Sequence, residues 1–127
     1  MNAPTQPLHL MPEINQRTTP QALIDALKAR FGERCSTALV VREQHGRDES
    51  SFAVPPPSAV VFAESTADVA AVVMLASQHN VPVIPFGVGS SLEGHLLAVQ
   101  GGISVDVSRM NKVLAINPED LTVTVQP

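Results

Sequence analysis

The sequence predicts an α/β fold, in an α+β two-layer arrangement where helices cover a sheet of mixed strand pairing. Two observations lead to this class. Apolar residues recur at helical spacing in the segments 20–31 and 65–80, and short apolar runs of strand length lie between and after them. Because helix and strand alternate first and several short strands follow, one mixed sheet with helices packed on it is expected.

The first part of the chain is expected to be a loose lead-in with one short helix. Residues 1–17 hold three prolines and show no periodicity. The helix 20–31 follows two threonines, begins at Pro20, which suits a first helical turn, and stops before Gly32. The apolar run 38–41 favours a short strand.

A linker is predicted between this lead-in and the rest of the chain. The stretch 45–51 is polar, and three consecutive prolines occupy 55–57. Proline fixes φ and has no N–H group, so these residues indicate an extended linker rather than the interior of a sheet.

A β-α-β unit is predicted over 59–85. The strands 59–63 and 81–85 flank a helix that begins after Ser65, in a capping box with Asp in place of Glu, and ends near residue 80. If the two strands are parallel neighbours, their crossover should be right-handed. The apolar face of the helix is expected to consist of Val69, Val72, Val73 and Ala76.

Short strands are expected in the last part of the chain. The segment 103–107 alternates with a period of two, 113–116 is apolar, and 121–125 alternates again. The residues 117–120 between the last two strands have the composition of a turn.

Composition excludes several classes of protein. The 127 residues are 44% hydrophobic with a net charge of -4, and the basic residues are scattered, so nothing indicates a nucleic-acid partner. One cysteine cannot form an internal disulfide framework or a multi-cysteine metal site. No secretory pattern or membrane-length apolar run is present. The cytoplasm is the expected location, and peripheral contact with the inner membrane stays open.

The most informative segment is the glycine-rich loop that directly follows the strand 81–85. Its glycines, Gly87, Gly89 and Gly94, allow positive φ and a close approach of the main chain to a ligand. Successive backbone N–H groups in such a turn can form a nest that binds an anion. Two serines add hydroxyl groups, and the loop holds no Lys or Arg, so a phosphate here would be bound by neutral dipoles.

Two common phosphate-binding motifs do not fit this loop. In the dinucleotide fingerprint G-x-G-x-x-G, the third glycine would precede Gly94 by two positions. Gly89 and Gly94 have the spacing of the ATP loop, but His95 and Leu96 stand where Lys and Ser or Thr are required, so ATP binding is a weak alternative. From composition alone, a tight turn without a ligand is equally favoured.

Four stretches together are typical of one protein family: 85–95, 101–106, 110–114 and 123–127. Through them, residues 57–127 resemble the first part of the FAD-binding domain of the vanillyl-alcohol-oxidase superfamily, the PCMH type. Within it, the family of D-lactate dehydrogenase (cytochrome) and the glycolate oxidase D-subunit is the most similar. The stretch 45–50 also looks like the lead-in of this family.

The resemblance implies that 57–127 is the N-terminal part of the FAD-binding domain and that 1–56 is a lead-in. It implies a cleft between two α/β subdomains, with the FAD pyrophosphate wrapped by main-chain N–H groups of the loop. The residues implied to bind the cofactor are Pro85, Phe86, Gly87, Val88, Gly89, Ser90, Ser91, Leu92, Gly94 and His95.

The resemblance also implies a reaction. A D-2-hydroxy acid such as D-lactate is oxidised to the 2-oxo acid, hydride passes to the flavin, and electrons go on to a cytochrome or a quinone. Glycolate is a rival substrate, as in an enzyme similar to the glycolate oxidase D-subunit. The family's sequence continues with a glycine beyond Pro127, so a truncated, non-catalytic FAD-domain fragment is the other alternative. No catalytic or metal-binding residue is carried over to this chain.

The mode of FAD attachment is also expected from the loop. Some relatives attach FAD covalently through a histidine in the equivalent loop. Because positions 86–90 hold no histidine, non-covalent FAD is expected.

Two polar clusters have simpler interpretations than catalysis. Glu93 and His95 could act as an acid and a base, but a pair that stabilises the turn is favoured. His45 with Asp48 and Glu49 could bind a metal, but a solvated turn is favoured.

Three single residues are interpreted in the same way. Cys35 is expected to be a buried or incidental thiol, and Met110 to fill the core. Asp106 could approach the cofactor or cap the next turn.

Overall fold

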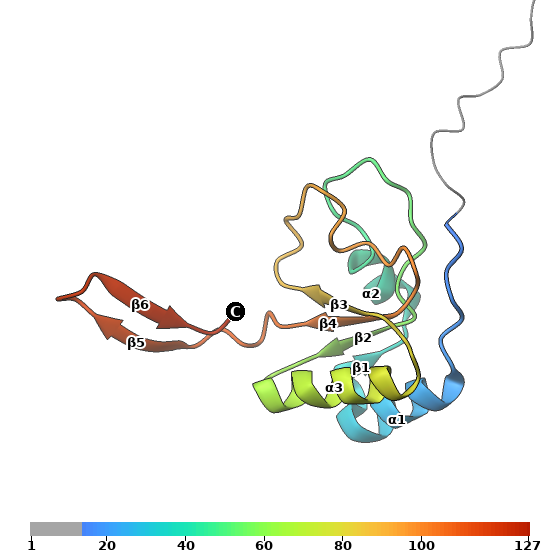
Figure 1. Ribbon diagram of the computed structural model, residues 1–127, viewed down its shortest axis with the longest axis horizontal. Coiled ribbons are helices and arrows are strands. Elements are labelled where there is room, and N and C mark those ends of the chain that lie inside the picture. Colours follow the sequence, from blue (N-terminus) through green and yellow to red (C-terminus); the bar gives the residue numbers. More distant parts are fainter. Residues whose placement is uncertain (1–13) are drawn as a thin grey trace, which may run out of the picture.

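The protein is represented by a computed structural model, in which the structure of residues 14–127 is described. A four-stranded sheet with the order β1-β2-β4-β3 lies at its centre (Figure 1). β2, β4 and β3 are parallel, and β1 pairs antiparallel with β2. The expected α/β class with mixed pairing is confirmed. The strands are β1 (Cys35–Ser36), β2 (Ala59–Phe62), β3 (Val83–Phe86) and β4 (Ile103–Asp106).

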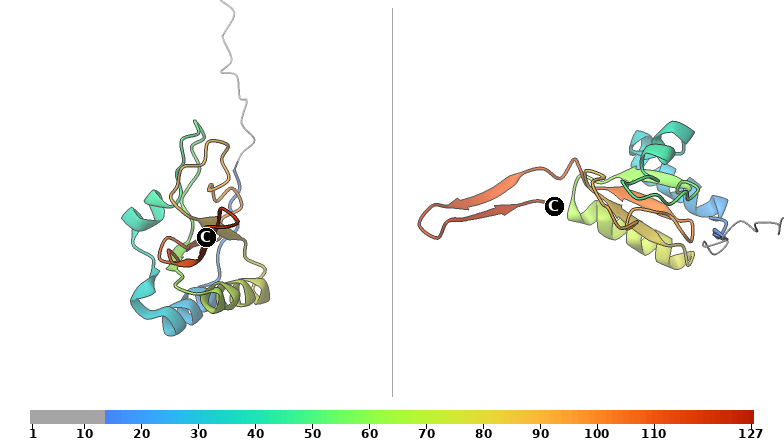
Figure 2. Two further views of the ribbon diagram at one scale, coloured as in Figure 1. Left: turned by 90° about the vertical axis from the view of Figure 1, so that its left-hand side faces the viewer. Right: turned by 90° about the horizontal axis from the view of Figure 1, so that it is seen from above.

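Helices cover the sheet unevenly. Helices α1 (Gln21–Phe31) and α3 (Thr66–Gln78) lie on one face, whereas α2 (Leu39–Gln44) and two long loops cover the other (Figure 2). A 3-10 turn, η1 (Gly32–Arg34), connects α1 to β1. The core beneath α1 and α3 includes the alternate strand residues Ala59, Val61, Ile103 and Val105.

Helix α1 confirms the segment predicted over 20–31. Leu23, Ile24, Leu27 and Phe31 are buried, as their helical spacing requires. The helix ends where Gly32, at a φ of 56°, donates its backbone N–H to the carbonyl of Lys28. Residues 1–13, most of the expected loose lead-in 1–17, lie outside the described residues.

Helix α3 begins with the predicted capping box. The Ser65 hydroxyl accepts a hydrogen bond from the backbone N–H of Asp68 at 3.1 Å. In return, the Asp68 carboxylate accepts from the N–H of Glu64 at 3.0 Å, one residue before the usual partner. The box therefore satisfies two N–H groups at the start of the helix.

The buried face of α3 differs in part from the prediction. Val72 and Ala76 are buried and Val69 packs against the core, as predicted. Val73, however, is 46% exposed, and Ala71 is buried instead. The face is a stripe centred on Val72, and a helical step of one residue turns Val73 away from it.

The apolar run 38–41 does not form a strand, so that prediction is wrong. It begins helix α2, in which Arg42 donates its backbone N–H to Ala38 at 3.0 Å and His45 to Val41 at 3.2 Å. Leu39 and Val40 remain 56% and 66% exposed. The run is apolar enough for a strand, but its backbone N–H and C=O groups form hydrogen bonds within the helix instead of with a neighbouring strand.

Two expectations about the strands also need correction. β2 and β3 are parallel but not neighbours, because β4 lies between them. The period-two alternation at 103–107 does not separate a buried from an exposed face, since all four residues of β4 are buried. Ser104 and Asp106 alternate with the core residues Ile103 and Val105, so they are enclosed on the opposite face of the sheet.

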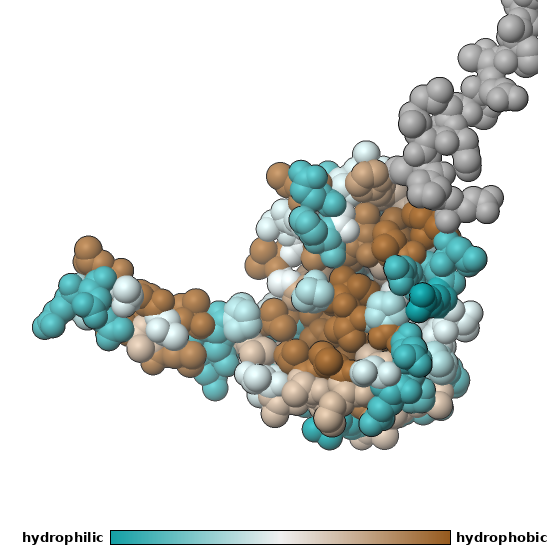
Figure 3. Space-filling model, in the orientation of Figure 1, coloured by the Kyte–Doolittle hydropathy of each residue, from teal (hydrophilic) through white to brown (hydrophobic). Residues whose placement is uncertain are grey.

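The last two strands form an arm separate from the main sheet. β5 (Val113–Asn117) and β6 (Thr122–Val125) pair antiparallel in a hairpin that projects from the body (Figures 1 and 2). The predicted strands and the turn between them are confirmed. Apolar side chains remain exposed along the arm (Figure 3): Val113, Leu114, Ile116, Leu121, Val123 and Val125. Among residues 14–127, no helix combines the length and apolarity needed to span a bilayer.

The Arg34–Asp68 contact makes stability depend on pH. Arg34 donates to Asp68 at 2.6 Å, and this hydrogen bond lowers the pKa of the carboxyl group in the folded state. A carboxyl group with a lowered folded pKa stabilises the fold above its unfolded pKa of about 3.9, and this contribution is lost as the pH falls below that value. We expect Asp68→Asn to lower the unfolding free energy at neutral pH.

Urea unfolding at about pH 7 and about pH 3 measures this difference. The difference between parent and variant should shrink at the lower pH. Asp120→Asn, in the exposed hairpin turn, is the matched control. A constant difference across this range would show that Asp68 acts without its charge.

Candidate functional site

Three strands end together at one edge of the sheet. The parallel registers place Phe62 of β2 and Phe86 of β3 on either side of Asp106 of β4. The glycine-rich loop leaves directly from Phe86. In open α/β sheets, ligands bind outside the carboxyl ends of the parallel strands, so the loop lies where a ligand site is expected.

The three glycines of the loop differ in whether the structure requires glycine at their positions. Gly89 has a φ of 73°, and a Cβ atom there would lie 2.9 Å from the ring of Phe86. Gly94 also has a positive φ, of 80°. Gly87 has neither constraint: its φ is not in the left-handed region, and a Cβ atom would meet nothing within 4 Å. Neither conformation nor packing therefore explains glycine at position 87, which leaves open space beside its backbone.

The backbone N–H groups at the start of the loop are free within the described chain. No N–H from Gly87 to Glu93 donates to a protein acceptor among residues 14–127. In a tight turn that binds no ligand, these N–H groups would be expected to form hydrogen bonds within the turn. Here they do not. Unpartnered N–H groups beside a residue of positive φ such as Gly89 are one requirement of an anion-binding nest, and the role of this loop as a nest stays a prediction.

The loop is attached to the protein at its middle and its end. Glu49 donates its backbone N–H to the carbonyl of Ser91 at 3.1 Å, and the ring of Phe52 would be 3.5 Å from a Cβ atom at Gly94. The Ser91 hydroxyl lies 3.1 Å from Nδ1 of His95.

The predicted site residues differ widely in exposure. Phe86, Gly89, Ser91 and Gly94 are partly buried; Pro85, Gly87, Val88, Ser90, Leu92 and His95 are exposed. Val88 and Leu92 are 87% and 67% exposed, although both are apolar. The structure thus brings all ten residues into one strand end and loop, and their role in binding stays a prediction.

His45 is the residue that sequence reasoning missed. A solvated turn was favoured for 45–51, yet His45 is only 6% exposed and lies under the loop. Its Nε2 is 2.8 Å from Oδ2 of Asp106, and its Nδ1 is 2.8 Å from the carbonyl oxygen of Val41. The ring packs against Phe86 at 4.2 Å between centroids. No signal in the local sequence pairs His45 with a residue 61 positions later.

Asp106 combines two contacts. Besides its bond to His45, its Oδ1 accepts from the backbone N–H of Ser108 at 2.7 Å, so it caps the next turn as one of the two expectations had it. With 4% exposure it is enclosed. Asp106 is therefore buried beside His45 and is not available on the surface of the loop.

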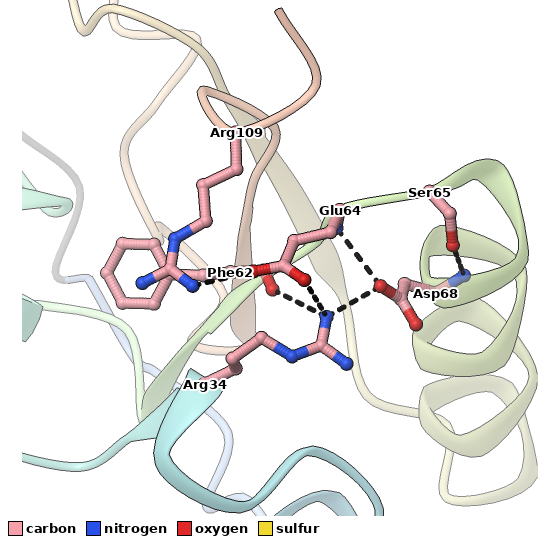
Figure 4. Close-up of polar contacts among 6 residues, drawn as sticks. All are labelled: Arg34, Phe62, Glu64, Ser65, Asp68 and Arg109. Atoms are coloured by element: carbon pink, nitrogen blue, oxygen red, sulfur yellow. Dashed lines mark hydrogen bonds and ion pairs between the residues drawn. The ribbon is translucent and has the colours of Figure 1, made fainter.

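The arginines near this edge are already paired with acids (Figure 4). Arg34 donates to Asp68, and also to the carbonyl of Phe62 at 3.3 Å. Arg109 donates to Glu64 at 2.8 Å and lies over the ring of Phe62. Both guanidinium groups are therefore paired with carboxylates.

The other candidate residues behave simply. Among the described residues, no group of His, Cys, Asp and Glu has a geometry that could hold a metal. Cys35 is buried as expected, and burial raises the pKa of its thiol, which disfavours the reactive thiolate. Met110 is buried in the core as expected. His95 lies within hydrogen-bonding distance of Ser91, and no hydrogen bond or ion pair joins it to Glu93 in the described chain, so the expected Glu93–His95 pair is not found.

A cavity of about 700 Å³ lies next to the site but is separate from it. Its lining includes Glu43, Arg47 and the segment 50–56, and none of the residues 85–95. Volume alone therefore does not point to the loop, whose free N–H groups do.

Residues 57–127 match the FAD binding domain family. This chain belongs to that family. A mitochondrial protein of Danio rerio, named as a probable D-lactate dehydrogenase, is 43% identical over 95 residues, which are 75% of this chain and 19% of the relative. The mitochondrial D-lactate dehydrogenase (cytochrome) of Arabidopsis thaliana is 36% identical over 113 residues, or 87% of this chain and 20% of that protein.

Solved structures agree with the family. An alkyldihydroxyacetonephosphate synthase has a TM-score of 0.73 at 27% identity, over 88% of this chain and 25% of that chain. p-Cresol methylhydroxylase has a TM-score of 0.69 at 20% identity over 78% of this chain and 20% of that chain, and shows the fold alone. The chain spans about a fifth of the length of the curated relatives given above.

The two glycines at the start of the loop provide a matched pair of variants. Gly89→Ala should destabilise the fold by about 1–2 kcal/mol, because alanine disfavours a positive φ and its methyl group would meet Phe86. Gly87→Ala should change the unfolding free energy by less than about 0.5 kcal/mol, because its environment is open.

For ligand binding, Gly87→Ala should lower FAD affinity by about tenfold or more, since one hydrogen bond to a charged group contributes about 1.5–3 kcal/mol. Urea unfolding and FAD titration give the two quantities. Undiminished binding by Gly87→Ala would show that the ligand does not approach this backbone position.

Proposed function

We propose that this chain supplies the diphosphate-binding part of a flavoenzyme that oxidises a D-2-hydroxy acid, with D-lactate as the first candidate, to the 2-oxo acid. In this proposal, backbone N–H groups from Gly87 to Ser91 bind the diphosphate of FAD. The single observation that carries it is the set of unsatisfied donors at the carboxyl edge of a parallel sheet, in a chain that belongs to the FAD binding domain family.

The chemistry of the loop suits FAD. A diphosphate offers several acceptor oxygens, and free N–H groups in a nest can donate to them without a cation. The open space beside Gly87 would let the diphosphate approach the main chain. When bound, FAD supplies the two-electron acceptor, and the protein supplies binding and orientation.

The substrate and the acceptor are inferred from relatives. Both relatives described above carry the name D-lactate dehydrogenase, and the one from Arabidopsis thaliana is named as a cytochrome enzyme. A D-2-hydroxyglutarate dehydrogenase of Stutzerimonas stutzeri is 34% identical over 110 residues, which favours a 2-hydroxy acid as the substrate class. D-lactate, with electrons passed to a cytochrome or a quinone, is the specific proposal for the whole enzyme.

A titration followed by NMR tests the binding proposal in a way that tolerates weak affinity. FAD added to the chain should shift the amide signals of Gly87–Ser91. Riboflavin, which has the flavin ring but no phosphate, should leave them unchanged, and ATP should bind no better than inorganic diphosphate. Shifts confined to other parts of the chain would remove the loop from the proposal.

We also propose non-covalent attachment, because positions 86–90 contain neither histidine nor cysteine. Acid precipitation of the FAD-loaded protein should then release all flavin into the supernatant, where its absorbance is measured. Flavin that stays in the pellet would contradict this, and His95→Gln would then show whether His95, the histidine of the loop, holds it.

The alternative function, FAD binding without catalysis, is favoured for these 127 residues by themselves. They span about a fifth of the curated relatives and contain no Trp or Tyr that could stack on a flavin. We expect the isolated chain to reduce no redox dye with D-lactate and added FAD. D-lactate-dependent dye reduction, measured by absorbance, would overturn this expectation.

A further inference from the structure

We propose that His45 is a positioning residue that holds the glycine-rich loop in its ligand-binding shape, acting through Phe86 and anchored by Asp106. The proposal assigns a role to the stretch 45–52, which the proposed function leaves unused. It rests on the proposed function only in the choice of the ligand that probes the loop.

The first step is the contact between His45 and the loop. The His45 ring packs on one side of Phe86, with centroids 4.2 Å apart and a tilt of 41°. Gly89 lies against the same ring, since a Cβ atom there would come within 2.9 Å of it. Phe86 therefore connects His45 to the loop backbone at Gly89, and in this proposal the packing of His45 holds the Phe86 ring in position.

The second step is the anchoring of His45 itself. The Val41 carbonyl can only accept, so Nδ1 of His45 donates to it across 2.8 Å. Nε2 of His45 lies 2.8 Å from Oδ2 of Asp106. Both ring nitrogens are therefore engaged, and Phe62 meets the ring edge-on at 5.6 Å. These contacts restrict rotation of the imidazole ring.

The third step is that the following residues hold the far part of the loop. Gly46 packs closely on the backbone of Pro56, where a Cβ atom would come within 2.9 Å, so the chain turns immediately after His45. Glu49 then donates to the carbonyl of Ser91, and Phe52 packs near Gly94. One continuous segment therefore supports the loop at its beginning, its middle and its end.

These contacts would matter for binding because the loop N–H groups have no partners of their own. Donors that must converge on one anion bind tightly only when they are held in place before the anion arrives. Within the described residues, no backbone N–H of Gly87–Ser91 donates a hydrogen bond, and the Ser91 side chain is tied to His95 inside the loop. The arrangement of these N–H groups therefore depends on supports from outside the loop.

The main test compares His45→Gln with His79→Gln in the whole chain. His79 ends α3, away from the loop, and its side chain forms no hydrogen bond within the described residues, so it is a matched control. Backbone ¹⁵N relaxation gives order parameters for Gly87–Ser91. These order parameters should be about 0.85 in the parent and in His79→Gln, and should fall below about 0.6 in His45→Gln. Affinity for inorganic diphosphate, titrated by NMR, should fall about tenfold in His45→Gln alone, a loss of about 1.4 kcal/mol.

A conservative variant distinguishes positioning from general packing. Asp106→Asn keeps an oxygen that accepts from Ser108 and adds an N–H that can donate to Nε2 of a neutral His45. The loop should then keep its parent order parameters and affinity, and the ¹⁵N signal of Nε2 in this variant should be that of an unprotonated ring nitrogen. If Asp106→Asn loosens the loop as much as His45→Gln does, the hydrogen-bonded geometry is not what positions it.

Phe86→Leu keeps the test decisive if His45→Gln fails to fold. It removes the ring that links His45 to Gly89 and should loosen the loop in the same way. Parent-like order parameters in either folded variant would overturn the proposal. If inorganic diphosphate and FAD fail to bind even the parent, the proposed function falls, and the order parameters alone decide the role of His45.

Discussion

The parallel pairing of β4 with both of its neighbours is the constraint on which the site depends. It brings the carboxyl ends of three strands to one edge, so that Phe62, Asp106 and Phe86 lie beside one another. Each contributes differently. Phe62 packs edge-on against the His45 ring, Asp106 is hydrogen-bonded to it, and Phe86 packs against it at the start of the loop. If β4 were not between β2 and β3, these three side chains would not meet.

In the proposed function, a highly charged ligand is bound without help from Arg34 and Arg109. The arginines at this edge are bound to Glu64 and Asp68, where they stabilise the start of α3. Main-chain N–H groups are left as the donors. Such donors are directional, so their usefulness depends on the rigidity of the backbone, which the segment 45–52 supplies from outside the loop.

Much of the fold could be predicted from local patterns, and the failures have a common cause. Helix α1, the Ser65 cap and the hairpin depend on neighbouring residues, and the sequence predicted them. The run 38–41 was misassigned because a short apolar run has no periodicity that separates strand from helix. The order of the strands, with β4 inserted between β2 and β3, was beyond reach because it depends on pairing between distant segments.

The same division applies to the site. The glycine-rich loop could be found because its residues are contiguous and their special conformations favour glycine. His45 could not, because its importance comes from Asp106, 61 positions away, and from a ring of another strand. Its local sequence is polar, which suggested solvent. His45 instead follows directly on α2, an element that the sequence did not predict, and is buried against Phe62 and Phe86.

The projecting hairpin has a consequence for how the protein behaves in solution. A two-stranded ribbon is marginally stable on its own. Each of the two strands has one edge of unpaired backbone groups, next to exposed apolar side chains such as Ile116 and Val123. Such edges can template pairing with another chain. At high concentration, aggregation and proteolytic nicking should therefore begin at the arm, while the sheet that carries the loop remains folded.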